Sequence, residues 1–304
     1  MQESYLPKSF KLNNQLEIPS IGLGTYKLEP LKDSIEKAIR LGYRSIDTAK
    51  MYKNEKEIGE VIKKLIDYNI VKRSDLFITT KLWNDDQENP VSALQNSLKE
   101  LNMEYVDLFL LHWPIGKIEN NRINQIPLYK TWAKLEECVK LGLTKSIGVS
   151  NFNVQLLLDL TSYANILPVV NQVEIHPFLV QENLVEFCKM YNILITTFNP
   201  LNKGSYISQV ENYEQYDLFN NSIVLSLAEK YQKTPAQIIL NWHVYRGLVP
   251  IPKSSNENRL KENLESTFFK MTESDYKLIS SLDVNKRFND SKLKSFTMGI
   301  DIFS

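Results

Sequence analysis

The sequence has little cysteine and no excess of charge. Its 304 residues include only two cysteines, Cys138 and Cys188, and 36 lysine and arginine residues balance 36 aspartate and glutamate residues. Two cysteines far apart in sequence do not fit a disulfide framework, and they are typical of a reducing compartment. A net charge of zero gives no electrostatic reason to expect nucleic acid or an anionic membrane as a partner.

Long apolar runs and metal-binding spacings are also missing. No apolar run approaches the roughly 20 residues that a membrane-spanning helix needs, and residues 1–10 lack the apolar core of a secretory signal. The three histidines, His112, His176 and His243, show neither HExxH nor paired-cysteine spacing. We therefore expect a cytoplasmic protein that holds no metal, contacts neither nucleic acid nor membrane, and acts on small molecules as a monomer or homodimer.

The sequence does contain a regular alternation of short apolar runs and longer helix-period segments. Eight such units, with continuously apolar strands, predict a parallel sheet covered by helices and closed as a (β/α)8 TIM barrel. The alternative is an open, doubly wound sheet. The predicted strands are 21–24, 43–47, 76–82, 106–112, 146–150, 169–174, 193–198 and 248–252, and the predicted helices are 31–41, 54–68, 90–101, 128–141, 154–164, 181–191, 235–246 and 256–266.

Several extra segments interrupt this alternation. An N-terminal hairpin is expected over residues 10–18, and two additional helices over 222–232 and 272–282, the second followed by a C-terminal tail over the pocket. Polar loops are expected at 115–127 and 202–221, after the fourth and seventh strands. No linker or shift in composition marks a boundary, so we expect residues 1–304 to form a single domain.

Ionisable residues stand at the ends of three consecutive predicted strands. The second strand ends in Asp47, with Tyr52 just beyond it, the third ends near Lys81 and the fourth in His112. The carboxyl ends of barrel strands converge on one mouth, so we expect these four side chains to share a pocket. A charge at the end of an apolar strand is costly to bury unless it is paired, and Lys81 and Asp47 can pair with each other.

The four residues form a coherent acid-catalysis group. A phenol with a pKa near 10 is a poor acid at neutral pH, but a neighbouring ammonium would lower that pKa. Tyr52 would then protonate a substrate oxygen as hydride reaches the carbon, with Lys81 oriented by Asp47 and neutral His112 directing the oxygen. Each residue also has a structural explanation: Asp47 as a helix cap, Tyr52 packed on the rim, Lys81 solvated, and His112 satisfied in the core.

A second candidate site lies between the last strand and its helix. Residues 252–259 combine Lys253, Arg259, two serines and a helix start, a set of groups that can hold a phosphate. The alternative is an ordinary capped helix with solvated cations. A Rossmann-type fingerprint is incomplete, because Lys27 stands where a third glycine would follow Gly22 and Gly24. Any nicotinamide nucleotide must therefore be held in another way.

Taken together, these motifs resemble the aldo-keto reductase family, and most closely its fungal xylose and aldose reductases. The resemblance follows family order from about residue 10 to residue 290. The motifs that carry it are Asp47-Thr48-Ala49-x-x-Tyr52-x-Asn54-Glu55, Thr80-Lys81-Leu82-Trp83, Leu111-His112-Trp113-Pro114, Gly148-Val149-Ser150-Asn151-Phe152, Ile251-Pro252-Lys253-Ser254, Ile70-Val71-Lys72-Arg73-Ser74-Asp75 and the tail Arg287-Phe288-Asn289-Asp290.

The resemblance implies a barrel that reduces aldehydes, aldoses and some ketones with NADPH, or more weakly with NADH, and it gives roles to further residues. The tetrad would be Asp47, Tyr52, Lys81 and His112. The implied cofactor residues are Ser150, Asn151, Gln172, Phe198, Pro200, Leu201, Lys253, Ser254, Ser255, Arg259, Glu262 and Asn263. The implied substrate residues are Tyr26, Trp83, Trp113 and Asn289. The loop 115–127 is shorter than in fungal xylose reductases, which leaves xylose itself open as the substrate.

Two other functions remain as alternatives at this point. A non-catalytic barrel could sense a nucleotide or serve a structural role, and a lyase or isomerase could use Lys81 as a Schiff-base amine. Loss of NADPH absorbance with an aldehyde would argue against the first. Borohydride trapping of substrate on Lys81 would favour the second.

The phosphate site generates a first prediction. Replacing Arg259 with alanine should weaken binding of NADPH far more than binding of NADH, because a charge-assisted contact to a 2′-phosphate contributes about 1.5–3 kcal/mol. Fluorescence titration with both nucleotides measures the difference. Equal weakening of both would refute this placement of the phosphate.

Overall fold

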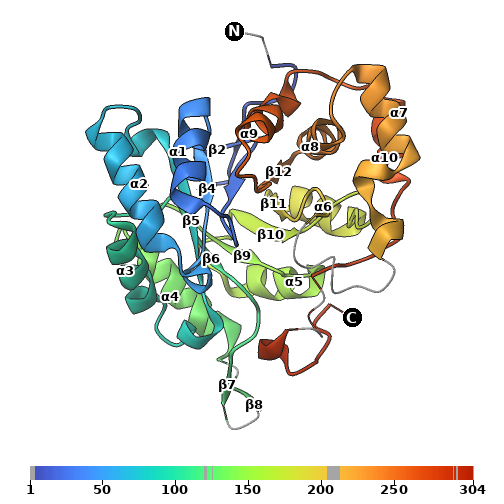
Figure 1. The fold of residues 1–304 in the computed structure, drawn as a ribbon. Coiled ribbons are helices and arrows are strands. Elements are labelled where there is room, and N and C mark those ends of the chain that lie inside the picture. Colours follow the sequence, from blue (N-terminus) through green and yellow to red (C-terminus); the bar gives the residue numbers. More distant parts are fainter. Residues whose placement is uncertain are drawn as a thin grey trace.

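Eight parallel strands curl into a barrel in the computed structural model, which describes residues 4–119, 122–124, 126–203, 213–289, 291 and 294–303 (Figure 1). The strands neighbour one another in chain order around the sheet. They are β3 (Leu23–Gly24), β4 (Ser45–Asp47), β5 (Phe77–Leu82), β6 (Leu108–Leu111), β9 (Ile147–Ser150), β10 (Val170–Glu174), β11 (Leu194–Phe198) and β12 (Leu248–Pro250).

Two backbone hydrogen bonds close the sheet between its first and last strands. The amide of Gly22 donates to the carbonyl of Pro250 at 3.0 Å, and the amide of Gly24 donates to that of Pro252 at 3.1 Å. The contact is close: a Cβ on Gly24 would lie 2.8 Å from the carbonyl oxygen of Ile251. The barrel prediction is therefore confirmed over the open doubly wound sheet.

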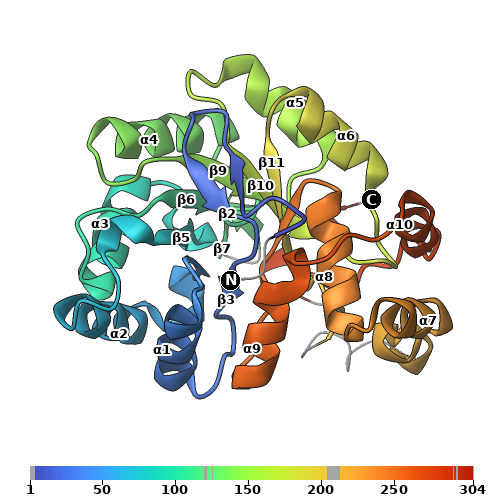
Figure 2. The same cartoon turned by 90° about the horizontal axis from the view of Figure 1, so that it is seen from above.

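Eight helices surround the strands, as the view along the barrel shows (Figure 2). They are α1 (Leu31–Leu41), α2 (Glu55–Asp67), α3 (Pro90–Leu101), α4 (Leu128–Lys140), α5 (Val154–Tyr163), α6 (Glu182–Met190), α8 (Pro235–Tyr245) and α9 (Glu257–Leu264). Local chemistry explains their ends: Thr234 and Gln237 form a capping box before α8, and α1 stops at Gly42, whose φ of 114° suits glycine. No helix in the described part of the chain is long and apolar enough to cross a membrane.

The added N-terminal hairpin closes one end of the barrel. The hairpin of β1 (Ser9–Lys11) and β2 (Glu17–Pro19) covers the amino-terminal end, where Leu12 and Ile18 pack on Phe77, Leu108 and Val249. The two extra helices are α7 (Ser222–Tyr231) and α10 (Glu273–Ser280), as predicted. With the amino-terminal end closed by apolar side chains, the cavity forms at the carboxyl ends of the strands.

One loop differs from its prediction, and others lie partly beyond what the structure describes. Residues 115–127 were expected to form a polar loop, and they contain in addition the antiparallel pair β7 (Lys117–Glu119) and β8 (Arg122–Asn124). In the register of this pair, the Cα partners are residues 117 and 124, 118 and 123, and 119 and 122, in two runs that alternate polar and apolar residues. Residues 120, 121, 125, 204–212 and Asp290 lie outside the described residues.

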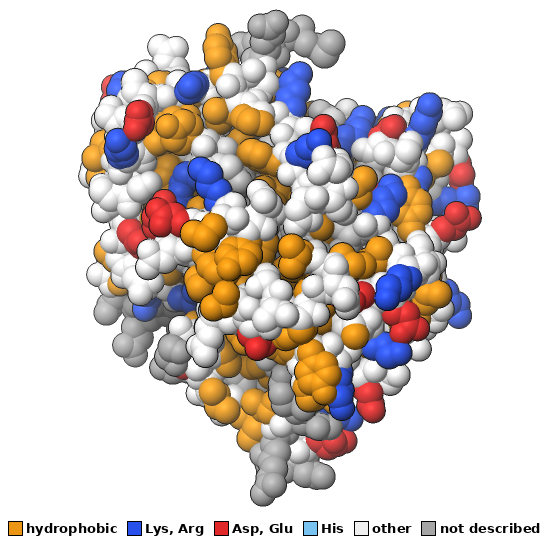
Figure 3. Space-filling view, turned by 180° about the vertical axis from the view of Figure 1, so that it is seen from behind, with side chains coloured by type: hydrophobic (Ala, Val, Ile, Leu, Met, Phe, Trp, Pro, Cys, Tyr) orange, Lys and Arg blue, Asp and Glu red, His pale blue; other side chains and the backbone are white. Residues whose placement is uncertain are grey.

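The face opposite to that of Figure 1 has hydrophobic side chains gathered near its centre (Figure 3). The helices α5 and α6 lie on this side of the barrel (Figure 2). Leu158 of α5 is 52% exposed and Met190 of α6 is 76% exposed. An exposed apolar face of this kind is a common feature of protein–protein contact surfaces.

Candidate active site

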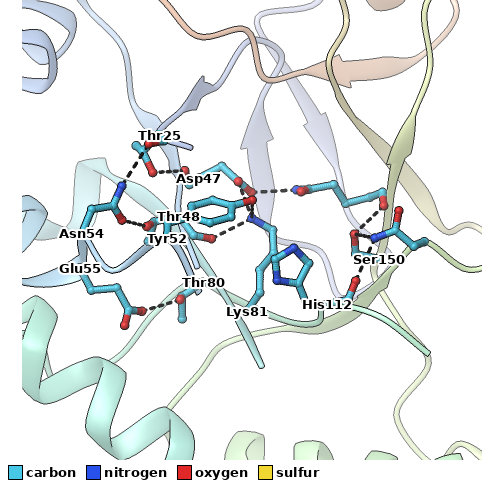
Figure 4. Close-up of polar contacts among 12 residues, drawn as sticks. Thr25, Asp47, Thr48, Tyr52, Asn54, Glu55, Thr80, Lys81, His112 and Ser150 are labelled. Carbon is cyan, nitrogen blue, oxygen red and sulfur yellow. Dashed lines mark hydrogen bonds and ion pairs between the residues drawn. The ribbon is translucent and has the colours of Figure 1, made fainter. Parts of the chain in front are cut away.

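The structure brings Asp47, Tyr52, Lys81 and His112 together at the open end of the barrel (Figure 4). Asp47 is the last residue of β4, Lys81 is the penultimate residue of β5, and His112 follows β6 directly. Tyr52 ends a short 3-10 turn (Lys50–Tyr52) between β4 and α2. Parallel strands in register place three of the four side chains, and the turn brings the fourth back over them.

The ammonium group of Lys81 is at the centre of this cluster. Its side chain is fully enclosed, and Nζ donates to Asp47 Oδ1 at 2.5 Å, to the Thr48 carbonyl at 2.8 Å and to the Tyr52 hydroxyl at 3.3 Å. An ammonium has three donors, so all three are used. Burial lowers the pKa of Lys81, while the charge of Asp47 opposes that effect. The pair therefore brings a positive charge directly against the phenol oxygen.

His112 is held as a neutral imidazole beside the phenol. Burial, together with the nearby Lys81 charge, lowers the pKa of His112 well below its ordinary value of 6.5. Its ring lies 5.9 Å from that of Tyr52 and 5.3 Å from that of Trp83, edge to face in both cases. Its carbonyl oxygen accepts a bond from Asn151 Nδ2 at 3.0 Å. A neutral ring in this place can hydrogen-bond a substrate oxygen without adding charge.

A surrounding set of hydrogen bonds keeps the turn that carries Tyr52 in place. Asn54 accepts from the Thr48 hydroxyl at 2.6 Å and donates to the Thr25 carbonyl at 3.0 Å, while the Thr25 hydroxyl donates to the Asp47 carbonyl at 2.9 Å (Figure 4). These hydrogen bonds connect both ends of residues 48–54 to Thr25, the residue that follows β3. Asn54 belongs to the motif that includes Tyr52, but sequence reasoning assigned it no role.

One cavity, of about 210 Å³, extends from the tetrad along the ends of the later strands. Asp47, Tyr52 and His112 line the cavity, whereas Lys81 lies behind Asp47 and Tyr52 and contacts both of these lining residues. The cofactor residues predicted from sequence that line the same cavity are Ser150, Asn151, Gln172, Phe198, Pro200, Leu201 and Lys253. A ligand in this cavity would therefore contact both sets of residues.

Polar groups beside the tetrad provide hydrogen-bonding capacity for a ligand. Gln172 Nε2 donates to Asp47 Oδ2 at 2.7 Å, and the Ser150 hydroxyl donates to the Gln172 carbonyl at 2.7 Å. Asn151 donates to the Ser150 hydroxyl at 3.1 Å, but its Oδ1 is buried with no hydrogen-bond partner among the described residues. A buried acceptor of this kind fits an amide donor on a ligand, and Phe198, partly exposed at the cavity, offers a ring face.

The remaining predicted cofactor residues follow Lys253 into α9, where Asn263 is buried at 3% exposure. Within the described residues, none of Ser254, Ser255, Arg259, Glu262 and Asn263 lines the cavity. Arg259 is exposed, and its backbone amide is capped by Asn256 Oδ1 at 3.0 Å. Lys253 Nζ donates to the Lys27 carbonyl at 3.0 Å; burial and the Lys27 charge lower the pKa of Lys253. This concentration of positive charge at a helix start suits a phosphate.

Aromatic side chains next to the tetrad form another part of the cavity wall. Of the predicted substrate residues, Tyr26, Trp113 and Asn289 line it, and Trp83 contacts it through Phe296, whose ring is 5.1 Å away. Sequence reasoning did not identify several lining residues: Thr25, Met51, Asn199, Lys203, Lys294 and Phe296. Phe296 comes from the irregular tail, where no periodic pattern indicates direction, so only its aromatic character could have suggested a wall.

The comparisons with known proteins agree with this geometry. Residues 20–284 match the sequence profile of the Aldo/keto reductase family. The chain is 41% identical to aldose reductase C of Dictyostelium discoideum, covering 93% of this chain and 92% of that protein. It is 40% identical to NAD(P)H-dependent D-xylose reductase of Scheffersomyces stipitis, covering 93% and 96%. The fold is similar to that of Bombyx mori aldo-keto reductase in complex with NADP, with a TM-score of 0.86, 35% identity, and coverage of 93% and 95%.

The electrostatics of the site predict that His112 does not titrate near neutral pH. Because its pKa lies well below 6.5, its imidazole NMR signals should stay constant between about pH 5.5 and 8. A His112→Gln variant identifies the signals. A His112 titration centred near 6.5 would contradict the assignment of a neutral ring.

Proposed function

The chain belongs to the Aldo/keto reductase family, and on that basis we infer that it is an oxidoreductase that reduces aldehydes, aldoses and some ketones to alcohols with NADPH. The observation that carries this inference is the contact between the buried Lys81 ammonium and the Tyr52 hydroxyl at 3.3 Å. It places a positive charge against a phenol on the wall of the cavity. Similar proteins include D-xylose reductases described as NADPH-dependent, NADH-dependent or both.

We propose that Tyr52 is the general acid. Its hydroxyl would give a proton to the substrate oxygen, and the Lys81 ammonium would stabilise the phenolate that remains. Asp47 keeps Lys81 charged and oriented, at 2.5 Å from Oδ1. His112, neutral and beside Tyr52, would orient the substrate oxygen by a hydrogen bond. The enclosure of Lys81 by three acceptors also speaks against the Schiff-base alternative, because the amine has no open approach for a carbonyl.

We propose that the residues along the rest of the cavity hold the nucleotide. When bound, NADPH supplies the hydride. The unpartnered Asn151 Oδ1, with Ser150 and Gln172, would bind the carboxamide, and the ring of Phe198 would stack on the nicotinamide. Toward the other end, the proposed contacts are Pro200, Leu201, Lys253, Ser254, Ser255, Arg259, Glu262 and Asn263. The cations of the last group favour a 2′-phosphate, so NADH should bind more weakly.

The substrate is proposed to be a small aldehyde or aldose. Tyr26, Trp83 and Trp113 would form an aromatic wall that matches the apolar face of a short carbon chain, and Asn289 would bind its hydroxyl groups. The buried Asn289 Oδ1 has no partner within the described residues, which supports that role.

We further propose that residues 1–304 form one domain, which the closed sheet and the family match over 20–284 support. A cytoplasmic location is proposed from the reduced cysteines Cys138 and Cys188, both buried and free. The chain is proposed to be a monomer or a homodimer, and the exposed Leu158 and Met190 offer a surface for a second copy. Sedimentation velocity distinguishes the two states.

The proposed function is tested by NADPH oxidation with a panel of aldehydes and aldoses. Tyr52→Phe should lower kcat by about 10²–10⁴-fold, because the acid is lost. NADPH should still quench tryptophan fluorescence in this variant. Tyr68→Phe, which changes an exposed tyrosine far from the tetrad, serves as control. A Tyr52→Phe enzyme within about tenfold of wild type would remove Tyr52 from the role of acid.

A further inference from the structure

A second buried carboxylate, Glu174, lies at the end of β10 and takes no part in the chemistry proposed above. Its side chain has no exposed surface. Oε1 accepts a hydrogen bond from Asn199 Nδ2 at 2.9 Å, and Oε2 accepts from the backbone amides of Asn289 at 2.9 Å and Phe288 at 3.3 Å. A buried carboxylate is costly unless its lone pairs are satisfied, and here three donors from two other segments satisfy them.

These donors come from two of the segments that line the cavity. Asn199 stands between Phe198 and Pro200, which line the proposed cofactor end, and its φ of 51° turns the chain sharply after β11. Asn289 lines the proposed substrate end, in the tail that follows α10. The same carboxylate therefore contacts both walls, although the residues are 25 and 115 positions away from it in sequence.

Neighbouring groups favour the charged form of Glu174. Burial alone would raise the pKa of this carboxyl, but His176, Arg287 and Asn199 outweigh burial, and the pKa falls below its ordinary value. His176 Nε2 lies 3.4 Å from Oε1. An ionised carboxylate accepts stronger hydrogen bonds than a neutral one, so the contacts to both segments are charge-assisted.

The tail also makes other contacts just before Asn289. Before it, the amide of Lys286 donates to the Phe178 carbonyl at 2.9 Å, and Arg287 donates to Gln181 Oε1 at 3.4 Å. The ring of Phe288 then packs against those of His176, at 5.3 Å, and Tyr216, at 5.4 Å. The backbone amide of Asn289 is held by Glu174. The carboxylate therefore holds the backbone at the residue whose side chain lines the cavity.

We propose that Glu174 is a positioning residue that fixes Asn289 against the substrate and Phe198–Pro200 against the cofactor, so that both binding regions share one buried anchor. This rests on the proposed function. Loss of the anchor should weaken the binding of both ligands and leave the proton transfer from Tyr52 unchanged, because none of the contacts of Glu174 reaches the tetrad among the described residues.

The test replaces Glu174 with glutamine, which keeps the side-chain volume. One carboxylate oxygen becomes an NH2 group, which cannot accept the hydrogen bond from Asn199 or from the backbone amides of the tail. The KM for D-xylose and the Kd for NADPH, the latter from fluorescence quenching without substrate, should each rise about tenfold or more. The kcat at saturation should stay within about threefold, because the tetrad is untouched. Butanal, which has no hydroxyl for Asn289, should show a much smaller rise in KM than xylose.

Two double variants separate the contact of Glu174 with Asn289 from its contact with Asn199. In an Asn289→Ala background, Glu174→Gln should no longer raise the KM for xylose but should still raise the Kd for NADPH. Glycine tolerates the left-handed backbone of residue 199, so Asn199→Gly provides the second background. There, Glu174→Gln should no longer raise the Kd for NADPH but should still raise the KM for xylose. Additive effects in both backgrounds would overturn the proposal, as would unchanged KM and Kd, or a fall in kcat with the ligand affinities unchanged.

If Glu174→Gln does not fold, Asn199→Gly alone carries the test. It should raise the Kd for NADPH and leave the KM for butanal unchanged, and an unchanged Kd would overturn the proposal. Failure of the proposed function would look different: the wild-type chain would then reduce no carbonyl compound in the panel. The Kd for NADPH reports on the contact between Glu174 and Asn199 independently of turnover.

Discussion

The site depends on one enclosed ion pair, between the ammonium of Lys81 and the carboxylate of Asp47. Neither charge would be tolerated alone at the end of an apolar strand, so each requires the other. The pair also fixes where the third donor of the ammonium points, which is at the hydroxyl of Tyr52. Buried charges must be paired, and the pair formed here places a positive charge beside the hydroxyl that we propose as the acid.

The barrel explains why these residues meet, and the sequence contained enough information to predict that. Asp47, Lys81 and His112 each end an apolar run in a chain that alternates strands and helices, so the convergence of strand ends predicts their neighbourhood. Helix and strand ends agree with prediction to within two residues. This agreement follows from the regular alternation of apolar runs and helix-period segments, which shows in the sequence where each strand ends.

The parts that escaped prediction are those placed by non-periodic contacts. Phe296 lines the cavity from the C-terminal tail. Asn54 fixes the end of the Tyr52 turn by a hydrogen bond to Thr25. Glu174 holds the tail by accepting hydrogen bonds from its backbone amides. No local pattern encodes such pairings, because each partner is far away in sequence. The β7–β8 pair was missed for a different reason: its strands are too short to stand out from a polar loop.

The pH dependence of kcat/KM in an Asp47→Asn variant tests the central claim most directly. Removing the negative charge makes proton loss from the neighbouring Lys81 ammonium easier, because the charge of Asp47 raises the pKa of Lys81 against the effect of burial. The account predicts that the alkaline limb of the profile moves to lower pH by about one unit or more. An alkaline limb at the wild-type position would show that the Asp47–Lys81 pair does not control the acid.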